Sequence, residues 1–206
     1  MIKNLIIDAG HGGIDAQGRY TTAPYKMHTF SNGEVAYEGV YNRKIAKYLY
    51  ILCKYTTNIK PFFTVHPSDP TDVPLSKRIE FANTFDAYDT LFYSLHSNAS
   101  PKHNARGFEL FTSRGETRSD KIAECVGNKI IKHFKKDQLV FRKDFSDGDL
   151  DKEANFKVLR ETKCSAILAE NLFFDQYDDF QKLKSPAFQI RVAWATMAGI
   201  LEFNKK

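Results

Sequence analysis

The chain has 206 residues, which is enough for one sizeable domain and hardly enough for two. Its hydrophobic content of 42% is ordinary for a globular protein, so disorder is not expected. The net charge of +5 suits an anionic partner or simple solubility equally well, because no dense block of Lys and Arg marks a binding patch. No stretch is long and apolar enough for a transmembrane span, so stable membrane insertion is not expected.

Strand-like and helix-like segments alternate along the chain. The first half predicts strands at 3–8, 62–66 and 90–95, a helix at about 38–55, and a short helix at 75–85 with Ser76 as its N-cap. The second half predicts strands at 107–112 and 166–170 and helices at 119–136 and 188–203. Segments 12–33 and 141–155 are predicted to be irregular. We therefore predict an α/β fold, with residues 1–206 as a single domain whose twisted, mostly parallel sheet is covered by helices on both faces.

Four polar residues stand where these segments begin or end. His11 in LIIDAGHGG, His96 in TLFYSLHSNAS and Glu170 in SAILAEN fall at or just past the carboxyl ends of predicted strands. Because such ends share one edge of a parallel sheet, the three side chains are expected to converge, and Glu38 at a helix start can approach the same edge. Two His and one Glu suit a zinc ion with an open position, and a second Glu suits proton transfer. The set predicts a zinc-dependent hydrolase.

The surroundings of His11 carry two further expectations. Gly10, Gly12 and Gly13 either let the backbone pass close to a ligand or metal, or form a plain tight turn. Asp8 is a candidate for orienting His11 through a hydrogen bond. The segment 12–33 joins two proposed ligands and is therefore expected to rim the site.

The three cysteines and the N-terminus bear on the cellular compartment. Cys53, Cys125 and Cys164 lie far apart without a CxxC pair, so neither a disulfide framework nor a zinc knuckle is expected. Buried thiols of this kind fit a protein that folds in a reducing compartment. The apolar run at 5–7 is too short for a signal peptide, so we expect synthesis in the cytoplasm without one.

Four motifs occur in the order found in a known family. DAGHGG, EGVYN, SLHSNAS and VLRETKCSAILAEN resemble segments of the zinc-dependent N-acetylmuramoyl-L-alanine amidases called amidase type 3, over about residues 3–203. The resemblance implies a zinc ion held by His11, Glu38 and His96, with Glu170 as the catalytic glutamate. Ala9 and Ser165 depart from the family by replacing Pro, and the segment 12–33 has no family counterpart.

The resemblance also implies a reaction and a setting. The substrate would be peptidoglycan, cleaved at the amide between N-acetylmuramic acid and L-alanine, with Glu170 as general base and then as proton donor to the leaving amine. The chain is similar to a phage endolysin, a monomer with no separate wall-binding module that acts on the cell wall after release. The alternative setting is the catalytic part of a host enzyme. No nucleic-acid partner is expected, because only the positive charge would favour one.

Two other functions remain open from the sequence. A zinc carboxypeptidase-like enzyme that cuts within the stem peptide would need an Arg for the terminal carboxylate, and Arg78, Arg106 and Arg160 are available. A non-catalytic wall-binding domain is disfavoured because all four site positions are intact. Asn98 is expected to bond either a ligand or its own loop.

Overall fold

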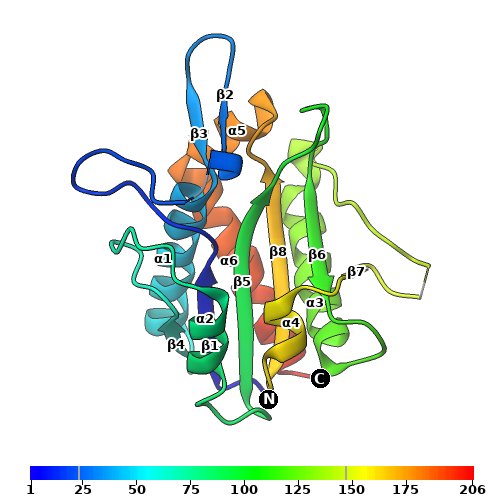
Figure 1. Cartoon of the computed structure of the whole chain (residues 1–206). Helices are drawn as coiled ribbons and strands as arrows, with labels where there is room; N and C mark the ends of the chain where they lie inside the picture. The colour runs from blue at the N-terminus through cyan, green and yellow to red at the C-terminus, as the bar shows by residue number, and fades with distance from the viewer. Residues whose placement is uncertain (23, 147) are drawn as a thin grey trace.

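The computed structural model describes residues 1–22, 24–146 and 148–206, and its main sheet has six strands. In the order β4-β1-β5-β8-β6-β7 they are Lys60–Phe63, Asn4–Ala9, Thr90–Asn98, Ser165–Phe173, Phe108–Thr112 and Lys152–Glu153 (Figure 1). The first four run parallel, whereas β6 pairs antiparallel with β8. The predicted α/β fold with a mostly parallel sheet is confirmed.

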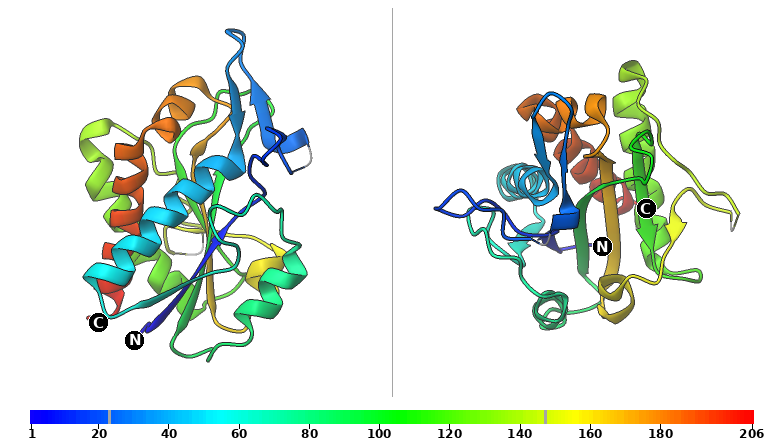
Figure 2. Two further views of the ribbon diagram at one scale, coloured as in Figure 1. Left: turned by 90° about the vertical axis from the view of Figure 1, so that its left-hand side faces the viewer. Right: turned by 45° about the horizontal axis from the view of Figure 1, so that its top comes forward.

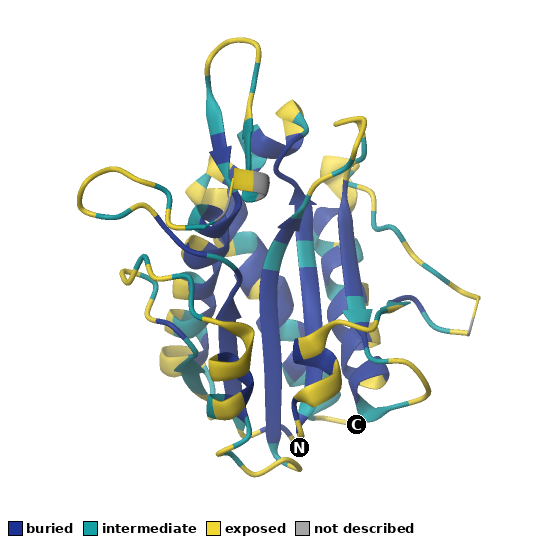
Figure 3. Cartoon of the chain, in the orientation of Figure 1, coloured by how far each residue is buried: buried dark blue, intermediate teal, exposed yellow. Residues whose placement is uncertain are grey.

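Helices cover both faces of this sheet (Figure 2). One face carries α1 (Glu38–Thr56), α3 (Arg118–Phe134) and α6 (Pro186–Phe203), and α5 (Tyr177–Lys184) packs beside α6. The other face carries α2 (Leu75–Ala82) and α4 (Lys157–Glu161). Alternate strand residues divide between the two cores, because successive side chains in a strand point to opposite faces. The central strands are therefore buried along almost their whole length (Figure 3).

Several predicted element ends move in the structure. β5 and β8 each extend three residues beyond their predicted ends, so His96 and Glu170 lie inside strands and face each other in register. The extension follows from pairing, because the neighbouring strand supplies hydrogen bonds that sequence periodicity does not reveal. The predicted N-cap at Ser76 is wrong: the extended Pro74 precedes α2 directly, and Ser76 lies in its first turn.

The segment 12–33 is more ordered than predicted. It contains a short 3-10 helix, η1 (Pro24–Lys26), and the strand β2 (Met27–Thr29), which pairs with β3 (Val35–Tyr37). Gly33 closes this hairpin with φ of 84°, a conformation that favours glycine. The hairpin projects beyond the carboxyl ends of the main strands (Figure 1). Strands of three residues are too short to give a periodic signal, which is why the sequence did not predict them.

Two smaller observations complete the fold. The side chains of Cys53, Cys125 and Cys164 are buried and free, as expected for small apolar residues. Among the described residues, no helix combines the length and apolar character that crossing a membrane requires.

Candidate metal centre

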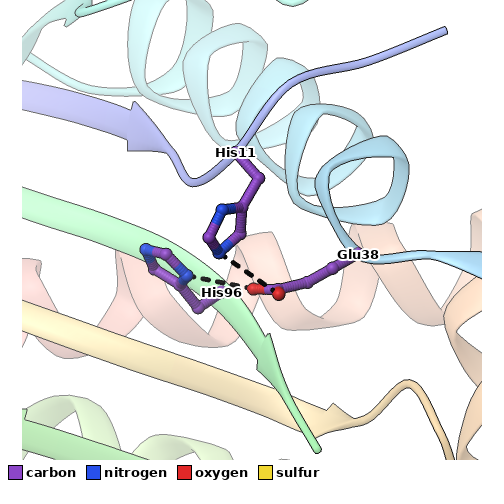
Figure 4. Close-up of side chains that lie close together, drawn as sticks. All are labelled: His11, Glu38 and His96. Atoms are coloured by element: carbon purple, nitrogen blue, oxygen red, sulfur yellow. Dashed lines mark hydrogen bonds and ion pairs between the residues drawn. The ribbon is translucent and has the colours of Figure 1, made fainter. Parts of the chain in front are cut away.

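Three of the four predicted residues meet at the carboxyl edge of the sheet (Figure 4). His11 follows β1, Glu38 is the first residue of α1, and His96 lies near the end of β5. Glu38 bridges the two imidazoles, with Oε2 lying 3.2 Å from His11 Nε2 and Oε1 lying 3.0 Å from His96 Nδ1. The predicted convergence of these three residues is therefore present in the structure.

The donor atoms of this cluster fit a divalent metal ion. His11 Nε2 and Glu38 Oε2 are buried without a hydrogen bond from any described residue, although they lie within ion-pair distance of each other. Burial alone would raise the pKa of Glu38, but its contacts with the two imidazoles outweigh burial and hold that pKa below its usual value. Burial lowers the pKa of His11, which favours the neutral imidazole that a metal requires. An ionised carboxylate between two imidazoles is a donor set typical of zinc sites.

Asn42 supports the ligands from one helical turn further along α1. Its Nδ2 donates to Gly10 O at 3.2 Å and to Glu38 Oε1 at 3.4 Å, while Ser97 Oγ donates to its Oδ1 at 3.3 Å. Asn42 ends the EGVYN motif, but the motif alone did not predict this role. The i, i+4 spacing from Glu38 was the available signal.

Arg43 fixes the backbone that carries His11. Its Nη1 donates to His11 O at 2.5 Å, and its Nε and Nη2 donate to Asp69 O and Thr71 O at 3.0 and 2.9 Å. His11 itself has φ of 66°, a left-handed conformation that is uncommon for a non-glycine residue. The guanidinium therefore ties a strained ligand position to the neighbouring loop.

The glycines beside His11 act through close contact rather than through an unusual φ. A Cβ added to Gly10 would overlap the His96 ring, and one added to Gly39 would overlap the carbonyl of Gly12. None of Gly10, Gly12 and Gly13 adopts the left-handed conformation, which His11 takes instead. Gly10 thus lets the backbone pass close to the His96 ring, whereas its close approach to a bound ligand or metal stays a prediction.

We predict that Gly10→Ala lowers metal affinity about 10–100-fold, the usual cost of disturbing what orients a ligand. The added methyl must displace the His96 imidazole. Metal content after dialysis, measured by mass spectrometry, checks this. Gly115→Ala is the control, since no atom lies within 4 Å of its added Cβ and it lies in the turn between β6 and α3, so it adds only the backbone strain of a residue with φ of 87°. Equal metal retention in both variants would contradict the prediction.

Asp8 does not orient His11. Its carboxylate is buried and accepts bonds from Arg78 Nη1 at 2.7 Å, Ser94 Oγ at 2.6 Å and Thr64 Oγ1 at 2.5 Å. No hydrogen bond joins Asp8 to His11 in the described structure, so that hypothesis is wrong. The strand places Asp8 beneath the site, where it pairs with a buried cation.

Glu170 lies beside the three ligands without joining them. It pairs in register with His96 on β5 and with Glu109 on β6, and its Oε2 is buried without a hydrogen bond from any described residue. Burial raises the pKa of Glu170 to about 8, and the opposing effect of His96 offsets only part of the rise. A carboxyl group in this environment can both accept and release a proton near neutral pH.

Glu109 is a buried neighbour of Glu170, and its place beside the site was not predicted from the sequence. It accepts bonds from Lys152 Nζ at 2.6 Å, Arg142 Nε at 2.8 Å and Asn98 Nδ2 at 2.5 Å. Asn98, at the end of β5, therefore bonds a side chain of β6 across the end of β8, and its Oδ1 also accepts from Ala99 N in its own loop.

A cavity of about 240 Å³ opens in front of His11, His96 and Glu170. Lys26 of η1 lines one side, with its Nζ 3.8 Å from Glu38 Oε2, so the segment 12–33 does rim the site as predicted. Phe156, which precedes α4, and Lys157 at the start of α4 line another side. None of Lys26, Phe156 and Lys157 was predicted from the sequence to line the site. The other histidines, His28, His66, His103 and His133, lie outside the cluster.

A mostly parallel sheet that gathers two His and a Glu at its carboxyl edge, beside a cavity, defines an α/β protein with a candidate site for a metal ion. Residues 5–202 match the family model for N-acetylmuramoyl-L-alanine amidase, type 3. The chain belongs to this family of amidases.

Individual relatives agree with this assignment. The chain is 32% identical over 188 residues to the N-acetylmuramoyl-L-alanine amidase CwlM of Bacillus licheniformis, covering 91% of this chain and 63% of CwlM. It is 28% identical over 207 residues to the endolysin of Bacillus phage SPP1, covering 98% of this chain and 66% of the endolysin. A crystal structure of an N-acetylmuramoyl-L-alanine amidase from Clostridium difficile 630 superposes with a TM-score of 0.77 at 26% identity, covering 100% of this chain and 98% of that one. The chain spans between 35% and 66% of the length of the curated relatives it matches.

Proposed function

We propose that this chain hydrolyses the amide bond between N-acetylmuramic acid and L-alanine in peptidoglycan, with a zinc ion held by His11, Glu38 and His96. The observation that carries the proposal is the cluster of the buried Glu38 with the partly buried His11 and His96, beside which Glu170 Oε2 is buried without a hydrogen bond from any described residue. Membership of the amidase family supports the bond that is cleaved.

Each residue of the site has a different role in the proposed reaction. Zinc, when bound, supplies Lewis acidity, which acidifies water and polarises an amide carbonyl. Glu170 accepts the proton of the attacking water and delivers a proton to the leaving amine of L-alanine. Glu38 keeps the two imidazoles in place, because its oxygens face one ring each. Lys26 and Lys157 place positive charge at the rim, where it attracts the carboxylates of a stem peptide.

We further propose that residues 1–206 act as one catalytic domain in the degradation of the cell wall. The similarity to the phage SPP1 endolysin supports a lytic role, and the continuous core on each face of one sheet supports a single folding unit. A monomer is the simplest form that this arrangement requires, because every residue proposed for the site comes from one chain.

The carboxypeptidase-like alternative is not favoured by the positions of the arginines. Arg78 lines the cavity but is only 2% exposed, and its guanidinium is engaged by Asp8, Asp72 and two backbone carbonyls. The other two candidates lie away from the cavity, Arg106 beside Asp178 and Arg160 beside Glu161. Within the described residues, no candidate Arg remains free to hold a terminal carboxylate in the cavity.

Purified chain incubated with peptidoglycan tests the proposal, with and without a chelator and with zinc added back. We expect free stem peptides that begin with L-alanine, loss of their release on chelation, and recovery with zinc. Mass analysis of the products gives the bond that is cut. Cleavage inside the stem peptide would favour the peptidase alternative, and release that persists without metal would contradict the zinc mechanism.

A further inference from the structure

A group of charged side chains continues the row of site residues beyond Glu170. His96 on β5, Glu170 on β8 and Glu109 on β6 pair in register, and paired residues point to the same face of a sheet. Adjacent strands lie about 4.8 Å apart, so Glu109 is one strand further from the proposed metal ligands than Glu170 is. Arg142 and Lys152 both contact Glu109 and therefore extend the site on the side away from the two imidazoles.

Lys152 can neutralise the buried carboxylate of Glu109 without Arg142. Glu109 Oε1 accepts bonds from Lys152 Nζ at 2.6 Å and from Arg142 Nε at 2.8 Å. Burial would raise the pKa of Glu109, but the two cations outweigh burial and hold that pKa below its usual value, so the carboxylate is ionised at neutral pH. Among the described residues, Asp144 interacts with Lys152, and no acidic residue other than Glu109 forms an ion pair with Arg142. Arg142 thus keeps positive charge available for a further anion.

The guanidinium of Arg142 also has two nitrogen atoms that are not used within the protein. Its Nε is held by Glu109, and its central carbon lies 5.4 Å from the centroid of the Phe173 ring at the end of β8. No residue in the described ranges accepts a hydrogen bond from Nη1 or Nη2, and the side chain is 39% exposed. The two contacts fix the planar group in place, and its free nitrogens match the two oxygens of a carboxylate.

The proposed reaction places the released peptide on the same side of the site. Glu170 delivers a proton to the leaving amine of L-alanine, so that amine must lie within hydrogen-bond reach of Glu170. The order of the strands puts Glu109 and Arg142 beyond Glu170 as seen from His96. An extended peptide advances about 3.3 Å per residue, so a carboxylate one or two residues past L-alanine can reach the next strand.

We propose that Arg142 binds a carboxylate of the stem peptide, one or two residues beyond L-alanine, and thereby determines which peptides the site accepts. The inference rests on the proposed amide hydrolysis, because that reaction sets the direction of the peptide. Arg142 does not line the cavity in front of His96 and Glu170, so it holds a distant carboxylate rather than one next to the cleaved bond. This position distinguishes it from the Arg that a carboxypeptidase requires.

Soluble N-acetylmuramoyl dipeptides and tripeptides that begin with L-alanine test the proposal, each made as the C-terminal acid and as the C-terminal amide. The zinc-loaded chain should cleave at least one acid with a KM about 10–100-fold below that of its amide and with a similar kcat. A charge-assisted hydrogen bond away from the reacting atoms changes binding and not the chemical step. Arg142→Gln should raise the KM for the acid to the value for the amide and leave the amide unaffected. Arg142→Lys keeps the charge without the planar group and should retain only part of the preference.

Lys143→Gln is the matched control for the loss of positive charge. It removes a charge from the next residue, whose Nζ lies over the Phe145 ring at 5.4 Å from its centroid, and it should keep the preference for the acid. Equal KM values for acid and amide in the wild type, at both peptide lengths, would overturn the proposal. A preference that survives in Arg142→Gln would overturn it as well and would assign the carboxylate to another cation, such as Lys26 or Lys157.

Binding of the free dipeptides and tripeptides separates this proposal from the proposed reaction. Calorimetric titration of each acid and each amide into the zinc-loaded chain requires no turnover. If no muramoyl peptide is cleaved, the proposed function fails, yet tighter binding of an acid that Arg142→Gln abolishes would still support the role of Arg142. Cleavage together with binding that does not distinguish acid from amide would instead leave the proposed function intact and overturn the role of Arg142.

Discussion

Replacing Glu170 by Gln is expected to lower amide hydrolysis by about 10²–10⁴-fold while leaving the metal content unchanged. The amide of Gln has nearly the same shape but cannot accept a proton from water. Glu170 lies outside the three-residue cluster, so zinc should stay bound. The rate of peptidoglycan hydrolysis tests the expected loss of activity. Mass spectrometry on the same preparation tests whether the metal content is unchanged.

Two further variants give the Glu170 result its meaning. Glu38→Gln should lose metal and activity together, because Glu38 supplies the carboxylate between the two imidazoles. Glu161→Gln removes an exposed carboxylate at the end of α4 and should leave both unchanged. If Glu170→Gln lost its metal, Glu170 would be a ligand rather than a base. Near-normal turnover with metal retained would exclude it from proton transfer.

The parts of this molecule that the sequence predicts well are those set by long apolar runs. β1, β5 and β8 are buried on both faces, so they appear as continuous apolar stretches and are easy to recognise. Once parallel strands are assumed, His11, His96 and Glu170 must reach one edge, and the structure places them there. The helix start at Glu38 was recoverable for the same reason, because α1 has a long periodic apolar face.

The parts that were missed depend on contacts between distant segments. Lys26 reaches the site through a hairpin whose strands have three residues each, and α4 has only five residues. Arg43 acts through backbone carbonyls at His11, Asp69 and Thr71, and no side-chain pattern records such bonds. Asp8 was correctly placed next to the site, but its partner lies 70 positions away on α2 and could not be deduced from local sequence.

The buried pair of Arg78 and Asp8 supports a second prediction. Arg78→Met should destabilise the fold by about 3–5 kcal/mol at pH 7.5. Arg78 and Asp8 are buried, and Arg78 Nη1 donates to both Asp8 Oδ1 and Ala9 O at 2.7 Å. The Met side chain fills similar space but leaves the carboxylate of Asp8 without its cation. Urea unfolding of wild type and variant at the same zinc concentration measures the difference. Arg160→Met, which removes an exposed Arg paired with Glu161, should cost no more than about 1 kcal/mol.

The pH dependence of this loss identifies the buried carboxylate as its cause. In the wild type, burial would raise the pKa of Asp8, but Arg78, Ser94 and Thr64 outweigh burial and hold that pKa below its usual value. The stability that Asp8 contributes is therefore present above its unfolded-state pKa and is lost as the pH falls through the lower folded-state pKa. Without Arg78, burial is opposed only by the two hydroxyls, the folded-state pKa of Asp8 rises, and protonation relieves the cost. The deficit of Arg78→Met should thus be smaller at pH 4.5 than at pH 7.5, whereas a deficit that is the same at both pH values would assign the loss to packing rather than to the charge of Asp8.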